Sequence, residues 1–268
     1  MNSVYVESVG LFAPGLNGWA NSTPVLRGEA AYVEDELPRY RPTLLSGNER
    51  RRATDSVRIA FGAGEDAVHG RLDEAARLAS VFVSSGGDYR IHDQICRGLL
   101  KPEKHISPTL FHNSVHNAPA GYWSIATGSA APSVSLCAYD YSVAAGLLEA
   151  TSLAFADRCD VLLVLSDSDV SEPLVEKRPV TRPFAAALWL APQQSDRALA
   201  RLTVSLSDGP ARQPDPQVAS LGTLCHGNPA ARVLPLLEVI ARSEPGSFNF
   251  PLASGGAMHV HAAPVDRD

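Results

Sequence analysis

The stretch PSVSLCAYD, from Pro132 to Asp140, decides the fold of this chain. Apolar residues alternate with serines between Ser133 and Ala138, and this period of two predicts a buried β-strand. After Asp140 the apolar residues recur at three- and four-residue steps with small residues between them, which predicts a helix packed on several sides. The first-turn amides of such a helix favour a negative charge. The side chain at the helix mouth, here Asp140, therefore bears on function.

The composition is that of an ordinary globular chain. Of the 268 residues, 45% are hydrophobic and 19% are charged, which fits one or two domains with an ample core. The net charge of −6 argues against a nucleic-acid-binding surface. The basic cluster Arg50-Arg51-Arg52 opens a helical pattern, and we interpret it as a solvated face.

The sequence also argues against a membrane or secreted protein. Its longest apolar run, residues 160–166, has the length of a strand rather than of a membrane span. The first residues begin a strand directly, without the basic and apolar regions of a signal peptide. The four cysteines, at positions 96, 137, 159 and 225, form no CxxC pair and are interpreted as reduced thiols. We therefore expect a cytoplasmic protein.

Strand and helix patterns alternate along the rest of the chain, which predicts the α/β class with parallel sheets covered by helices. A capping box at Ser46 and Glu49 begins a helix that is predicted to reach Val68. Residues 21–41 are polar and lack a clear period. Further helices are predicted at 91–100, 122–127 and 229–242, and strands at 4–11, 79–84, 161–165, 185–190, 202–206 and 257–262, with 185–190 and 202–206 as a hairpin.

The histidines and cysteines suggest no metal site and no clear dyad. His112 and His116 flank Asn113 just before Pro119, so they do not share a helix face, and no metal is expected. Cys137 is interpreted as a small buried hydrophobe, although it stays an alternative nucleophile. Cys225 and His226 are adjacent in sequence, and adjacent side chains point apart.

Asp140 also has a purely structural interpretation. Aspartate is a preferred residue at helix N-termini, where capping is worth about 1 kcal/mol. The residues alone thus support an α/β domain of unknown activity, and no more.

The order of motifs resembles the N-terminal half of a β-ketoacyl synthase. The motifs are Ile106-Ser107-Pro108, then residues 117–121 (NAPAG), Gly128, residues 132–136 (PSVSL) and the small-residue helix. Counting from Pro132 puts the nucleophilic cysteine of that family on Asp140. Residues 222–231, which contain His226, resemble the loop of its second active-site histidine.

The departures from the family pattern concern its catalytic residues. Asp140 replaces the cysteine, and no His-Gly-Thr-like motif lies between Leu206 and Cys225. Leu221 stands where the family has a lysine, and Ser254 where it has a gating phenylalanine. A carboxylate is a poorer nucleophile than a thiolate, and its charge would repel a malonyl carboxylate. No catalytic residue is therefore expected, and His226 is the one retained histidine.

The resemblance implies a chain-length factor, similar to the short ones of aryl polyene and xanthomonadin-type pathways. Such a subunit has no chemistry of its own, needs no cofactor, pairs with an active β-ketoacyl-ACP synthase and shapes its acyl tunnel. The acyl carrier protein would meet it through this heterodimer. The implied tunnel and interface residues are Leu110, Phe111, His112, His116, Pro132, Val134 and Leu136.

The resemblance also implies the fold, a truncated thiolase-like arrangement of layers in the order α-β-α-β-α. Residues 1–268 would form one domain, with an N-terminal half of about 1–166 and a shortened C-terminal half of about 167–268. The strand at 131–136 would pair across the dimer, because an unpaired apolar edge strand promotes aggregation.

Two other functions stay open at this point. One is an acyltransferase or hydrolase that uses Asp140 or Cys137 with His226, although the sequence offers no oxyanion donors for it. The other is a homodimeric acyl-binding protein without a dedicated synthase.

Overall fold

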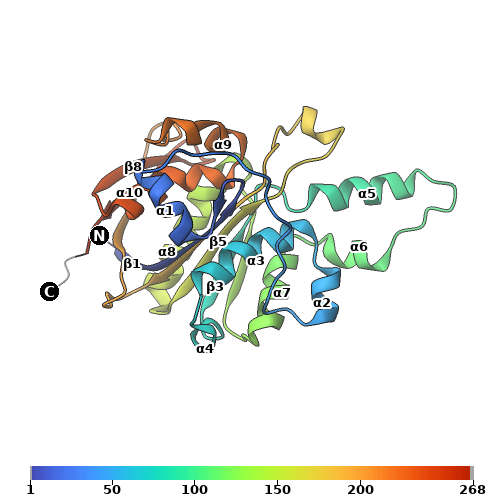
Figure 1. Cartoon of the computed structure of the whole chain (residues 1–268), viewed down its shortest axis with the longest axis horizontal. Helices are drawn as coiled ribbons and strands as arrows, with labels where there is room; N and C mark the ends of the chain where they lie inside the picture. The colour runs from blue at the N-terminus through green and yellow to red at the C-terminus, as the bar shows by residue number, and fades with distance from the viewer. Residues whose placement is uncertain (1, 266–268) are drawn as a thin grey trace.

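The first strand, β1 (Asn2–Ala13), is the centre of the fold in this computed structural model, which describes residues 2–265. Residues 5–12 of β1 pair antiparallel with β6 (Phe184–Ala191), and residues 2–6 pair antiparallel with β7 (Ala200–Ser207). The two neighbours lie on opposite sides of β1, and Tyr5 and Val6 pair with both. The result is one continuous nine-stranded sheet (Figure 1).

The sheet is mixed rather than parallel. β3 (Ala79–Val83) pairs in parallel with β4 (Ser133–Leu136) and with β5 (Val161–Asp167), and every other pairing is antiparallel. The α/β class is confirmed, whereas the hairpin predicted from residues 185–190 and 202–206 is wrong, because β1 lies between these strands. The remaining strands are β2 (Leu16–Asn17), β8 (Gly246–Pro251) and β9 (Ala257–Ala263), and the sheet order is β4-β3-β5-β6-β1-β7-β9-β8 with β2 beside β1.

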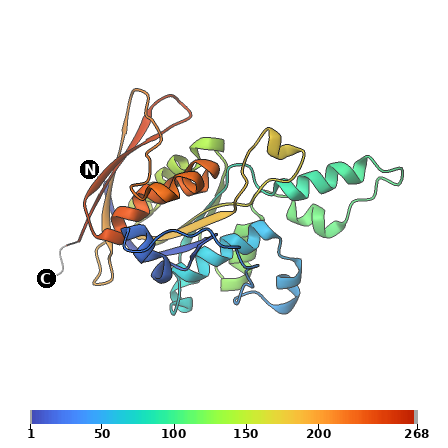
Figure 2. The same cartoon turned by 45° about the horizontal axis from the view of Figure 1, so that its top comes forward.

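Helices cover both faces of this sheet (Figure 2). One core contains α3 (Asp55–Ala67) and α7 (Ala118–Thr127). The other contains α8 (Ser142–Asp157), α1 (Trp19–Arg27) and α10 (Leu234–Arg242). Where the resemblance implies two sheets in five layers, β7, β9 and β8 here extend the first sheet through β1 instead of forming a second one.

Two helix boundaries differ from the sequence predictions. The helix expected from Ser46 to Val68 is two helices, because α2 (Gly47–Arg52) ends and the side chain of Thr54 then caps α3 by accepting a hydrogen bond from Val57 N. The cap predicted at Ser46 is confirmed, since its hydroxyl accepts from Glu49 N at 3.3 Å. Helix α1 forms partly within the stretch expected to be irregular, and it buries Val25 and Leu26.

The helices α5 (Tyr89–Leu99) and α6 (Pro108–Asn113) extend from the body as an arm (Figure 1). The other helices are α4 (Leu72–Ala75), α9 (Gly222–Gly227) and short 3-10 turns at Tyr139–Tyr141, Leu174–Glu176, Ala219–Leu221 and Ala230–Val233. Within residues 2–265 no helix combines the length and the apolar character needed to cross a membrane.

Candidate functional site

The strand β4 leads into the site from one edge of the sheet. It pairs only with β3, where Ser80 N donates to Pro132 O at 2.9 Å and Ser84 N donates to Leu136 O at 3.2 Å. Sequence analysis predicted a buried strand, but Ser133 is exposed and Val134 to Leu136 are only half-buried. The reason is its position, since the other side of β4 has no neighbour in the described chain.

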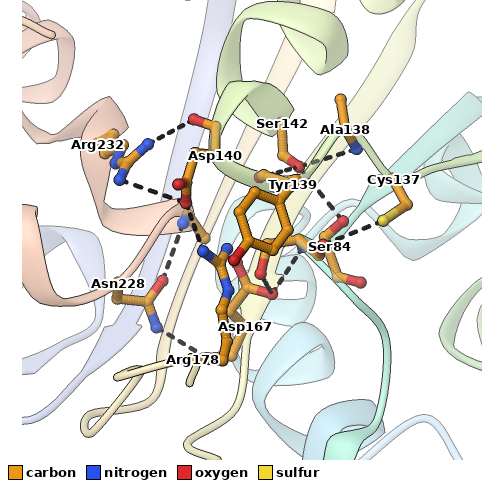
Figure 3. Close-up of polar contacts among 12 residues, drawn as sticks. Ser84, Cys137, Ala138, Tyr139, Asp140, Ser142, Asp167, Arg178, Asn228 and Arg232 are labelled. Carbon is orange, nitrogen blue, oxygen red and sulfur yellow. Dashed lines mark hydrogen bonds and ion pairs between the residues drawn. The ribbon is translucent and has the colours of Figure 1, made fainter. Parts of the chain in front are cut away.

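A sharp turn joins β4 to α8. Tyr139 has φ of 53°, a left-handed conformation that is unusual for a non-glycine residue. Ser142 closes the turn: its hydroxyl accepts from Ala138 N at 3.1 Å and donates to Tyr139 O at 2.7 Å (Figure 3). Asp140 follows directly, so the structure brings it to the mouth of α8, as the sequence pattern indicates.

Two arginines hold Asp140 (Figure 3). Arg178 Nη1 lies 2.6 Å from Asp140 Oδ1, and Arg232 Nη2 lies 3.4 Å from the same atom. Arg232 Nη1 also donates to the Asp140 carbonyl at 2.6 Å. The carboxylate that replaces the expected nucleophile is thus engaged by charged hydrogen-bond donors on two segments distant in sequence.

Arg178 is the best buried of these three side chains, at 11% exposure against 34% for Asp140 and 20% for Arg232. Its guanidinium carbon lies 3.7 Å from the centroid of the Tyr139 ring, a cation–π contact. Burial acts to lower the pKa of Arg178, but the hydrogen bond and charge of Asp140 outweigh it and raise that pKa. The arginine therefore stays charged and fills the space over the turn.

Asp167, at the end of β5, is a buried carboxyl group beside this cluster. Its Oδ1 accepts from Ser85 N at 2.7 Å and from Ser85 Oγ at 2.9 Å, while its Oδ2 has no hydrogen-bond partner. Burial raises the pKa of Asp167 to about 6, although the hydrogen bonds from Ser85 and the charge of Arg178 act in the opposite direction. A proton on Oδ2 would lower the cost of the missing partner.

Asn228 joins the segments that supply the two arginines. Its Nδ2 donates to Asp167 O at 3.1 Å and to Arg182 O at 2.8 Å, and its Oδ1 accepts from Ala230 N at 2.9 Å. The residue is fully buried. It fixes the turn that carries Arg232 against the end of β5, and so positions the cluster.

The residues of the hydrolase alternative do not meet. His226 is an exposed residue of α9, and its Nε2 lies 2.9 Å from Oδ1 of Asp215. Between residues 2 and 265 no contact joins His226 to Asp140 or Cys137. Cys137 is exposed, and its thiol donates to Ser85 O at 3.1 Å. The interpretation of Cys137 as a buried hydrophobe is therefore wrong, since the residue follows a sheet edge that is open.

Four of the seven predicted tunnel and interface residues lie on or near α6, whereas Pro132, Val134 and Leu136 lie on or beside β4. Phe111 is 69% exposed, Leu110 is half-buried, and the ring of the exposed His112 lies edge-on to Tyr122 at 6.4 Å. His116 Nε2 lies 3.2 Å from Ser84 Oγ; burial lowers the pKa of this histidine, and the contact with Ser84 partly offsets it. The part of the chain that is described holds no group of three or more metal-binding side chains.

Sequence analysis missed most of the residues around Asp140. Asp167 could have been found, because it follows an apolar strand and functional groups gather at the carboxyl ends of strands. Arg178 and Arg232 lie 38 and 92 residues away from Asp140, in a loop and in a short turn, and no local pattern indicates their contact with it.

Comparisons with known structures support the predicted fold. The chain is similar to one in the complex of a ketosynthase (ApeO) with its chain length factor (ApeC) from Xenorhabdus doucetiae, at 24% identity and a TM-score of 0.70, covering 96% of this chain and 98% of that one. It is also similar to a chain of the AntDE:AntF complex, a type II PKS acyl-carrier protein with its ketosynthase, at 15% identity and a TM-score of 0.75, covering 98% and 99% of the two chains. The ishigamide ketosynthase/chain length factor gives 11% identity and a TM-score of 0.70, covering 99% and 100%. These likenesses confirm a thiolase-like ketosynthase fold.

The sequence itself gives the family. No curated protein sequence matches the chain. The profile described as "Beta-ketoacyl synthase, N-terminal domain" matches residues 29–247, which make up most of this chain. The matched region includes β4, the turn at Tyr139 and all three members of the Asp140 ion-pair cluster. The chain therefore belongs to the β-ketoacyl synthase family.

Proposed function

We propose that this chain is a chain-length factor: a non-catalytic subunit that pairs with an active β-ketoacyl-ACP synthase and shapes the tunnel for the growing acyl chain. The observation that carries the proposal is the ion pair between Asp140 and Arg178 at the position of the family nucleophile. A carboxylate engaged in this way has neither the nucleophilicity of a thiolate nor an unobstructed path to a thioester.

The electrostatics of the mouth differ from the expectation based on Asp140 alone. Two guanidinium groups surround one carboxylate, so the cluster does not repel a malonyl group as an isolated aspartate would. The missing thiol and the space taken by Arg178 are what prevent condensation in this subunit.

The open edge of β4 supports a partner. In the structures of known complexes, the similar chains come from ketosynthase assemblies, two of which name a chain length factor. In a parallel pair the N–H and C=O of one residue point to the same side, and successive residues alternate. The hydrogen bonds of Pro132 and Leu136 to β3 therefore leave Ser133 and Ser135 with backbone groups directed outward, ready to pair with another strand.

The proposal includes a cytoplasmic location. All four cysteines are free, which supports a reducing compartment. A synthase partner with a catalytic thiolate would need the same environment.

Co-expression with a cysteine-containing synthase tests the proposal. We expect the two chains to co-purify as a heterodimer, and this chain alone to neither decarboxylate nor condense malonyl-carrier protein. Measurable decarboxylation by the purified chain would contradict the proposal.

A single-residue substitution tests whether the open edge of β4 is the interface with the synthase. Ser135→Pro removes one outward N–H of β4 without removing a hydrogen bond to β3, so we expect a folded subunit that no longer co-purifies with the synthase. Ser135→Ala is the matched control, because it changes the side chain and keeps the N–H. If the proline variant co-purified with the synthase as well as the alanine variant does, β4 would not be the interface between the two subunits.

A further inference from the structure

A hollow lies on the opposite side of the sheet from Asp140, next to the core that contains α3. It has a volume of about 450 Å³, which is within the range of small-molecule sites. It opens where the end of β5 meets the start of α3, and Ser168 lines it while the preceding Asp167 faces the Asp140 cluster. Its walls are formed by charged side chains, among them Arg39, Arg58 and Arg90, and by apolar ones.

One wall comes from the most basic segment of the chain. Residues 39–58 contain six arginines and two acidic residues, whereas the rest of the chain has 17 basic and 27 acidic residues. Arg51 and Arg52, in the cluster interpreted as a solvated face, are exposed, whereas Arg58 is only 8% exposed. A positive charge buried in an otherwise acidic protein requires compensation.

The hydrogen bonds of Arg58 go to backbone carbonyls. Its guanidinium donates to Ala53 O at 3.1 Å, to Tyr40 O at 3.0 Å and to Arg50 O, and no ion pair with a carboxylate occurs within residues 2–265. Burial and the nearby charge of Arg39 lower the pKa of Arg58, and the nearby charge of Asp55 acts to raise it. The site thus has a cation that an incoming anion would stabilise.

The other arginines leave the hollow with an excess of positive charge. Arg90 pairs with Asp169 and lies 3.7 Å from Asp55, and Arg39 lies 3.7 Å from the same Asp55. The hollow thus has three guanidinium groups, of Arg39, Arg58 and Arg90, and two carboxylates, of Asp55 and Asp169. Arg90 Nε has no hydrogen-bond partner in the described part of the chain.

Ser168 is the second sign of a missing ligand. It is 4% exposed, and its hydroxyl has no hydrogen-bond partner among residues 2–265. An unsatisfied buried hydroxyl costs about 1–3 kcal/mol, so it is rarely left without a function. The wall beside it is apolar, formed by Phe12, Ile59 and Pro183.

We propose that this hollow binds a small organic anion, with its carboxylate or phosphate group at Arg39, Arg58 and Arg90 and its apolar body against Phe12, Ile59 and Pro183. The Ser168 hydroxyl donates a hydrogen bond to the bound molecule. The proposal does not depend on the role of the chain as a chain-length factor.

Thermal shift and calorimetric titration of the purified protein, with its synthase partner bound if the two co-purify, test the proposal. The probes are benzoate, phenyl phosphate and the neutral benzyl alcohol. We expect one or both anions to bind with a dissociation constant of about 1 mM or lower and to raise Tm, and the alcohol to do neither. Absence of binding by both anions, or equal binding by the alcohol, would overturn the proposal.

Two variants locate the binding. Leu37→Asp puts a negative charge on a half-buried wall residue and should abolish anion binding, whereas Leu206→Asp, on exposed β7, should leave it unchanged. Ser168→Ala keeps every charge and should weaken binding about fivefold, the loss of one hydrogen bond. Anion binding that survives in Leu37→Asp would place the ligand elsewhere and refute the assignment.

Discussion

Replacement of Asp140 by asparagine is the most direct test of how the mouth of α8 is held. The amide has nearly the size of the carboxylate and still accepts one hydrogen bond, but it carries no charge. Arg178 and Arg232 would then be neighbouring cations, at 11% and 20% exposure, with no carboxylate between them.

The size of the effect follows from the contact geometry. A hydrogen bond at 2.6 Å between charged groups contributes about 1.5–3 kcal/mol, more than a neutral one. The 34% exposure of Asp140 lets water screen part of the interaction, which favours the lower half of that range. We expect Asp140→Asn to lower the free energy of unfolding by about 2 kcal/mol, and Tm by about 4–6 °C for a chain of this size.

A double-mutant cycle separates the ion pair from other effects. Arg178→Met keeps most of the packing against Tyr139, and the combined variant completes the cycle with Asp140→Asn. We expect a coupling energy of at least about 1 kcal/mol from thermal or urea unfolding. Glu29→Gln is the matched control, because Glu29 and Arg27 are both well exposed and 3.9 Å apart, and it should change stability by less than about 0.5 kcal/mol.

The cycle also has a clear negative outcome. If the two substitutions add within about 0.5 kcal/mol, Asp140 and Arg178 do not act as a pair. The claim that the Asp140–Arg178 ion pair closes the N-terminal end of α8 would then be refuted, even if the chain still bound a synthase.

Three further predictions concern the same region. Burial raises the pKa of Asp167 to about 6, so between about pH 4 and pH 6 the folded chain binds a proton that the unfolded chain releases, and stability falls as pH rises through this window. The Tm of Asp167→Asn minus the Tm of the parent should therefore increase from pH 5 to pH 7.5. If this Tm difference were the same at both pH values, the pKa of Asp167 would not be raised. Asp140→Cys should not restore condensation, measured with malonyl-carrier protein, because no His-Gly-Thr-like motif lies between Leu206 and Cys225; full activity would show that the missing motif is supplied elsewhere. Gly146→Ala should cost about 1–3 kcal/mol in urea unfolding, because the added Cβ would lie 2.7 Å from a methyl group of Val83; an unchanged midpoint would mean that α8 shifts freely.

The sequence predicts the local parts of this site well and the distant parts poorly. The turn from strand to helix, and Asp140 at its end, follow from a change in apolar period within about twenty residues. The ion pair with Arg178 depends on the path of a loop that has no period. Local patterns determine whether a residue lies in a strand, a turn or a helix. The packing of segments that are distant in sequence determines which residues its side chain contacts.

The sheet order illustrates the same limit. β6 and β7 are consecutive strands, and sequence proximity favours pairing between them. β1 lies between them because one side of β1 pairs with β6 and the other side with β7, and Tyr5 and Val6 pair with both. The apolar alternation at residues 4–11 predicts this strand, but it does not indicate which strands pair with it.

The wrong prediction of a buried β4 is itself informative, because the two edges of the sheet differ. At the other edge, β8 exposes Ser247 and Asn249, the polar residues expected where a strand faces water. On β4 the apolar residues Val134 and Leu136 are only half-buried, although they pack against the main core. The alternation of apolar residues and serines in β4 is thus typical of a strand that is more deeply buried than β4 is within this chain alone. The remaining burial is what a partner strand at Ser133 and Ser135 would supply, and for this reason the comparison of Ser135→Pro with Ser135→Ala tests the assembly and not the fold.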